Sequence, residues 1–375
     1  MTRGAAARIV SIDVLRGLVM ALMALDHTRD FFSTGDFNPR DVTEPALFLT
    51  RWVTHLCAPT FIFLAGLSAC LYGRNRSVGQ VSRFLATRGL WLILIDITLI
   101  RFGWRFEFDL LRMQAGIIFV IGASMIALAA LIWLPRWAIA ALALIMVAGH
   151  NLLDGVRPEQ LGGAGWAWYL LHQPGMVRLG GGVSLYVLYP LIPWIGVMAA
   201  GYALGPVMQL APEARRRFLF RLGAAITLGF VLLRASSLYG DPAVWAVQET
   251  WLSTLLSFLN CEKYPPSLLY LMMTLGPALM LLAAFEHARG RVAEVLTVFG
   301  RVPFFFYVVH IYLIHALAIA TVFAITGTLA AAPPVGFGLP GVYLAWLVVL
   351  CLLYPLCRWF AGLKRRRSDW WLSYL

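Results

Sequence analysis

The chain has 375 residues, of which 61% are hydrophobic and only 13% are charged. An ordinary soluble domain carries about 25% charged residues, so a soluble fold is excluded because it could not bury this much apolar surface. The 30 Lys and Arg residues outnumber the 18 Asp and Glu residues, giving a formal net charge of +12. Most of this positive charge lies in short connections between apolar runs, which is typical of membrane topology rather than of nucleic-acid binding.

Apolar runs of membrane-spanning length recur along the whole chain. They predict an all-α fold, a polytopic membrane helix bundle of about ten transmembrane helices in one domain, residues 1–375. If the N-terminus is cytoplasmic, most Lys and Arg residues fall on the cytoplasmic side, so we expect both termini there and the bacterial cytoplasmic (inner) membrane as the location. The predicted spans are residues 11–32, 52–72, 89–104, 114–134, 137–153, 183–205, 219–236, 266–286, 302–326 and 340–361.

Two stretches are predicted to lie at the outer surface without crossing. Residues 242–259 place Trp and Leu near helical spacing between polar residues, which predicts an amphipathic helix. Residues 154–181 are rich in Gly, Trp and His and are expected to cover the outer mouth of the bundle. The cysteines form no CxxC pair, so we interpret them as small core residues rather than as disulfides or metal ligands. They are Cys57, Cys70, Cys261, Cys351 and Cys357.

The first run, residues 11–32, carries several ionisable groups, which a cleavable signal peptide would not need. A charge at the bilayer centre costs about 2.5–3.5 kcal/mol on insertion scales, so such groups suggest function. His27 follows Arg16 by about three helical turns, which puts both on one face about 16 Å apart. Asp30, one turn beyond His27, or the adjacent Asp26 is expected to orient the imidazole as a base. The alternative, a merely polar end of a helix, stays open.

Further polar residues are predicted near the outer half of the bundle, where they would contact a substrate. Each histidine among them is equally compatible with a packing role, and Arg101 belongs to a charged cluster that can satisfy itself. A zinc site is not expected, because no ligand pair has helical spacing of the HExxH type. The candidate substrate-binding residues are His55, Arg101, Lys263, Tyr264, His310 and His315.

Four segments carry a resemblance to a known family. The segment IDVLRG and the ten residues between Arg16 and His27 resemble the Arg-x10-His signature of the transmembrane acyltransferase superfamily. CAPTFIFLAGLSACLYGR (57–74), KYPPSLLYLMMTLGP (263–277) and GRVPFFFYVVHIYLIH (300–315) are similar to bacterial proteins grouped with heparan-alpha-glucosaminide N-acetyltransferase.

The resemblance implies an enzyme that takes an acyl group from cytoplasmic acetyl-CoA, or another acyl-CoA, and delivers it to a sugar amine or hydroxyl on the far side. Arg16 and His27 carry over as the functional pair. Because coenzyme A phosphates need cations, Arg16, Arg83 and Arg88 are the candidate cofactor contacts. The large luminal loop of the lysosomal enzyme has no counterpart, which leaves the acceptor open.

The favoured hypothesis is a membrane acyltransferase in which His27 is a general base or transiently carries the acyl group. The rival is a transporter or flippase, which would also turn polar residues inward, although no inverted repeat is evident. The expected partners are the lipid bilayer and a small-molecule or glycan acceptor, with no nucleic acid and no metal. The oligomeric state is open, a dimer included.

Overall fold

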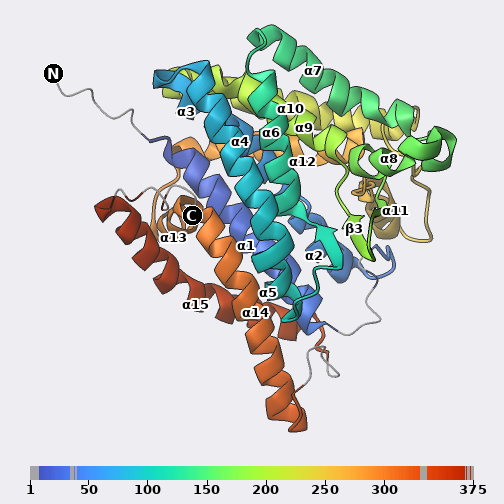
Figure 1. The fold of residues 1–375 in the computed structure, drawn as a ribbon, viewed down its shortest axis with the longest axis vertical. Coiled ribbons are helices and arrows are strands. Elements are labelled where there is room, and N and C mark those ends of the chain that lie inside the picture. The colour runs from blue at the N-terminus through green and yellow to red at the C-terminus, as the bar shows by residue number, and fades with distance from the viewer. Residues whose placement is uncertain are drawn as a thin grey trace.

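The computed structural model describes residues 8–33, 38, 40–329, 336–367, 369 and 372. These residues form a bundle of helices with a small sheet beside it (Figure 1). The predicted helical bundle is confirmed, whereas an all-α class is not correct because three short strands pair with one another.

The helices alternate with short connections along most of the chain. In the first half they are α1 (Val10–Phe32), α2 (Pro45–Thr54), α3 (Cys57–Tyr72), α4 (Val78–Ile95), α5 (Arg101–Arg105), α6 (Ile117–Leu131), α7 (Arg136–Gly149) and α8 (Gly165–Leu171). In the second half they are α9 (Leu191–Leu204), α10 (Pro212–Ser236), α11 (Trp251–Leu259), α12 (Leu268–Ala284), α13 (Arg291–Arg301), α14 (Pro303–Thr326) and α15 (Leu339–Arg366). Short 3₁₀ segments are η1 (Gly73–Asn75), η3 (His150–Leu153), η4 (Pro158–Ala164), η5 (Gly205–Gln209) and η6 (Phe285–His287), and η2 (Asp96–Ile100) is a short π segment.

Seven helical segments in the described part of the chain are long and apolar enough to cross a membrane. The predicted spans 11–32 and 89–104 coincide instead with more polar helices, α1 and α4–α5, and 114–134 coincides with the shorter α6. A total of ten spans and cytoplasmic termini therefore stay predictions. The seven segments are Pro45–Asn75, Arg136–Leu153, Leu191–Gln209, Pro212–Ser236, Leu268–His287, Pro303–Thr326 and Leu339–Arg366.

The sheet accounts for one difference from the predicted spans. It consists of β1 (Arg112–Ala115), β2 (Gly175–Gly180) and β3 (Val183–Val187) in the order β1-β3-β2. Strand β3 runs parallel to β1 and antiparallel to β2. The predicted span 183–205 is therefore wrong at its start, where the backbone hydrogen-bonds to two neighbouring strands before α9 begins.

Other differences concern where helices begin. α4 starts at Val78 rather than near residue 89, because Ser77 and Gln80 cap it reciprocally. It continues through the π turn η2 into α5. The predicted amphipathic helix 242–259 is helical only over α11. Residues 154–181 fold into η4, α8 and β2, and their covering role stays a prediction.

A close crossing of α1 and α13 positions the first helix. A Cβ on Gly17 would lie 1.8 Å from the carbonyl oxygen of Leu296, and one on Gly300 would lie 1.8 Å from that of Asp13. Glycines at such positions let two helix backbones approach within a membrane. The crossing brings the carbonyl of Gly300 to the side chain of Arg16, 3.2 Å from its Nη1.

The two ends of the described chain lie at the same end of the bundle (Figure 1). Lys364, in the last turn of α15, is close enough to Arg8 and Arg16 to interact with their charges. This arrangement agrees with termini that share one side of the membrane. We refer to this end of the bundle as the α1 N-terminal end.

Candidate functional site

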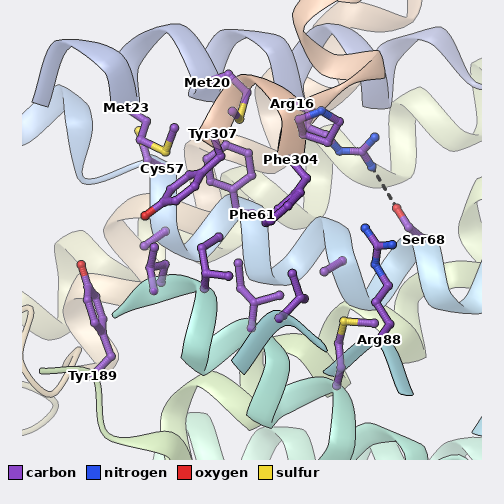
Figure 2. A pocket seen from close by; sticks show the side chains of 18 of the residues that line it. Arg16, Met20, Met23, Cys57, Phe61, Ser68, Arg88, Tyr189, Phe304 and Tyr307 are labelled. Carbon is purple, nitrogen blue, oxygen red and sulfur yellow. Dashed lines mark hydrogen bonds between the residues drawn. The ribbon is translucent and has the colours of Figure 1, made fainter. Parts of the chain in front are cut away.

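An elongated cavity of about 380 Å³ lies between α1, α3, α4, α6 and the start of α14 (Figure 2). Arg16 and Arg88 lie at one end of it, and Tyr189 lies at the other. Because Arg16 and His27 both line this cavity, the face they share on α1 points into the protein rather than toward lipid. The lining includes Arg16, Met20, Met23, Asp26, His27, Cys57, Phe61, Ser68, Arg88, Tyr189, Lys263, Phe304 and Tyr307.

The Arg16 end of the cavity is cationic. Arg16 donates from Nη2 to the hydroxyl of Ser68 at 2.9 Å, the contact drawn in Figure 2. Its Nη1 lies 3.6 Å from the carboxylate of Asp13, which also pairs with Arg8. Arg88 from α4 lines the same end. Two guanidinium groups at the same end of a cavity suit a phosphate-bearing ligand, which guanidinium groups can bind through paired hydrogen bonds.

The middle of the cavity is apolar. Met20 and Met23 face Phe61 and Phe304 across it, and Tyr307 projects from α14 (Figure 2). Methionine side chains adapt readily to ligands of irregular shape. This section therefore suits an uncharged, extended chain, with its anionic end at Arg16.

His27 forms a hydrogen-bonded pair with a histidine from α14. Its Nδ1 lies 2.7 Å from Nε2 of His310, and Nδ1 of His310 lies 3.1 Å from the carbonyl oxygen of Phe306. A carbonyl only accepts, so His310 donates from Nδ1 and, when neutral, accepts at Nε2 from His27. The Nε2 atom of His27 is then left with its lone pair. This tautomer is the one that a general base requires.

The two aspartates near His27 bind other groups. Asp26 forms an ion pair with Arg29 at 2.8 Å and accepts a hydrogen bond from the hydroxyl of Thr54 at 3.0 Å, and it lines the cavity. Asp30 is exposed and pairs with Arg29 at 3.0 Å. His310 thus makes the contact with His27 that the sequence pattern assigns to Asp30 or Asp26. The pattern missed it because the partner lies on a distant helix.

Lys263 brings a cation to the His27 end. It precedes α12, is 8% exposed and lines the cavity, with its Nζ 5.2 Å from the ring centre of Tyr264. Burial acts to lower the pKa of Lys263, but Tyr264, Tyr270 and Asp26 outweigh it and the pKa is raised above its ordinary value. The hydroxyl of Tyr264 lies 3.4 Å from that of Tyr189. The sequence gives no signal for Tyr189.

The remaining candidates lie away from the cavity lining. His55 is buried against the ring of Tyr270, and His315 places its Nδ1 2.9 Å from the carbonyl of Gly103. Arg101 donates from Nε to the carbonyl of Asp109. Arg83 is exposed on α4. As predicted, four of the cysteines are buried, but Cys351 is exposed.

These features define an integral membrane protein with an internal cavity suited to a long, partly anionic ligand. Residues 8–238 match the family described as heparan-alpha-glucosaminide N-acetyltransferase, catalytic, and the chain belongs to this family. The resemblance noted in the sequence is thereby confirmed, and membership identifies a membrane transferase of the acetyltransferase type. No curated protein matches the chain.

Proposed function

We propose that the protein transfers an acyl group from acyl-CoA to an amine or hydroxyl, on a sugar, within the cavity that joins Arg16 to His27. The observation that carries the proposal is this continuous cavity, with two arginines at one end and, at the other, a histidine whose Nε2 keeps its lone pair. The donor enters from the α1 N-terminal end, which is cytoplasmic in a bacterial inner membrane. The acceptor enters from the opposite side.

The charges along the cavity favour one orientation of the donor. Its phosphates pair with Arg16 and Arg88, and its uncharged pantetheine arm lies along the apolar section between Met20 and Phe304. The rise of α1 separates Arg16 from His27 by about 16 Å, so the thioester is directed toward the imidazole. Positioning both reactants in this way removes much of the entropy cost of a bimolecular reaction.

The chemistry follows from the tautomer of His27. Its Nε2 takes the proton from the acceptor hydroxyl or amine as the acceptor oxygen or nitrogen attacks the thioester carbonyl. The carbonyl carbon then expels the thiolate of coenzyme A, which receives the proton from Nε2. The products are the acylated acceptor and the free thiol. Lys263 lies at this end and binds the acceptor.

The test is transfer of radiolabelled acetyl from acetyl-CoA to glucosamine, and to a panel of free hexoses, by the full chain in proteoliposomes. His27→Ala is expected to lower turnover by about 10²–10⁴-fold, the contribution of a positioned general base. His287→Ala serves as the control, because His287 is a surface residue on η6. A folded His27→Ala protein with full turnover contradicts the proposal. Counterflow of the sugar without a covalent product favours the transporter.

A further inference from the structure

Three side chains of the types that can ligate metals meet outside the cavity, where the end of α7 approaches the end of α8. His150 follows α7, Asp154 lies four residues further along, and His172 follows α8. A ligand atom from each lies within 4.8 Å of the others. Nε2 of His172 is already 3.0 Å from a carboxylate oxygen of Asp154. The sequence pattern did not predict this group, because one ligand comes from a separate segment.

Both imidazoles in this group are buried with polar atoms left unsatisfied. His150 is 1% exposed and His172 is 0% exposed. Within the described structure, neither ring nitrogen of His150 makes a hydrogen bond, and neither does Nδ1 of His172. The carbonyl of Pro266 approaches His150 without hydrogen-bond geometry. Such groups cost about 1–3 kcal/mol each when buried without a partner, so the arrangement calls for a ligand.

We propose that His150, Asp154 and His172 bind one Zn²⁺ ion. Two imidazole nitrogens and a carboxylate oxygen form a ligand set that zinc prefers, with water as the fourth ligand. With bonds of about 2.0–2.2 Å, tetrahedral ligand atoms lie about 3.3 Å apart, so small side-chain rotations close the site. The side chain of Asp154 is 29% exposed, which gives the ion a path from solvent.

A second layer of hydrogen bonds supports the site and links it to α12. The amide nitrogen of Asn151 donates to Oδ2 of Asp154 at 2.9 Å. The side-chain oxygen Oδ1 of Asn151 accepts a hydrogen bond from the backbone N–H of Leu268, at the start of α12, at 2.9 Å. Such outer contacts orient metal ligands and strengthen binding. The ion therefore joins the ends of α7 and α8 to each other, next to the segment before α12 that carries Lys263. This proposal does not depend on the proposed transfer reaction.

The test uses the full chain in detergent, stripped of metal with a chelator and titrated with Zn²⁺ alone. Bound zinc is measured by elemental analysis, and unfolding is followed by thermal denaturation. We expect about one zinc per chain and a rise in the unfolding temperature on zinc addition, because binding to the folded state stabilises it. The rise should disappear when the chelator is added again.

His150→Leu separates the proposal from a purely structural cluster. Leucine has a similar size, and without a metal the replacement of an unpaired buried imidazole is neutral or stabilising. With the metal, zinc affinity falls by at least about tenfold and the zinc-dependent rise in unfolding temperature is lost. His55→Leu is the matched control for zinc content, since His55 is also buried with both ring nitrogens unpaired. A wild-type chain that binds no zinc, or a His150→Leu chain that binds it as tightly as wild type, overturns the proposal.

Discussion

Nδ1 of His27 lies 2.7 Å from Nε2 of His310, although 283 residues separate them in the chain. The contact joins α1 to α14 and is continued by the bond from His310 to the carbonyl of Phe306. His310 is 0% exposed, so water does not substitute for this partner. These two hydrogen bonds, which we call the His27–His310 relay, fix the protonation of the His27 ring. Nδ1 of His27 carries the proton, and Nε2 is free to accept a second proton.

A first prediction concerns His310 as a positioning residue. His310→Phe removes the acceptor for Nδ1–H of His27, so we expect kcat to fall about a hundredfold, the lower end of a general base's contribution. His310→Gln offers a carbonyl oxygen to the same N–H and should restore part of the rate. The measurement is kcat and its pH profile for both variants. Equal rates in the two variants would mean that packing alone explains the position.

A second prediction concerns the donor end of the cavity. Arg16→Gln and Arg88→Gln each should raise KM for acetyl-CoA about tenfold or more, since a hydrogen bond to a charged group contributes about 1.5–3 kcal/mol. KM for acetyl-pantetheine, which lacks the nucleotide phosphates, should stay unchanged. Steady-state kinetics with both donors makes the comparison. Arg217→Gln is the control, because Arg217 is exposed on α10. A parallel rise for both donors would exclude phosphate recognition by these arginines.

A third prediction concerns Lys263. Because its pKa lies above the ordinary lysine value, the side chain stays charged throughout the neutral and mildly alkaline range. Lys263→Met should therefore raise KM for glucosamine and leave KM for acetyl-CoA unaffected. Lys263→Arg keeps the positive charge, so its KM for glucosamine should be lower than that of Lys263→Met. Initial rates at varied glucosamine concentration provide the measurement. An effect on the donor alone would place Lys263 in a different role.

A fourth prediction concerns the crossing of α1 and α13. Gly300→Ala adds a methyl group where 1.8 Å separates a Cβ from the carbonyl oxygen of Asp13. The helices must separate, which typically costs about 1–3 kcal/mol, and the unfolding temperature should fall. Gly149→Ala is the control, since a Cβ there meets nothing within 4 Å. Thermal denaturation in detergent compares the two variants. A Gly300→Ala protein with an unchanged unfolding temperature would show that α1 and α13 can separate at little cost in stability.

Local periodicity predicted much of the fold and part of the site. The helical spacing of Arg16 and His27 placed both on one face of α1, and both line the cavity. The sheet was missed, because β3 depends on pairing with β1, which lies about 70 residues earlier along the chain.

The partners of the site residues were harder to predict than the residues themselves. Ser68 and His310 reach α1 from other helices, through contacts that no single segment encodes. Asp30 has the helical spacing of an orienting carboxylate but turns to Arg29, its chain neighbour. Sequence spacing indicates which side chains share a helix face, whereas the choice among competing partners depends on tertiary packing.

The cavity draws its walls from both ends of the chain, and this limits how the protein can be divided. A fragment ending at residue 238, where the family match ends, retains Arg16 and His27. It lacks Lys263, Phe304 and the histidine on α14, so one wall and the relay are missing. The smallest unit able to carry out the proposed transfer must therefore include helices from the C-terminal third.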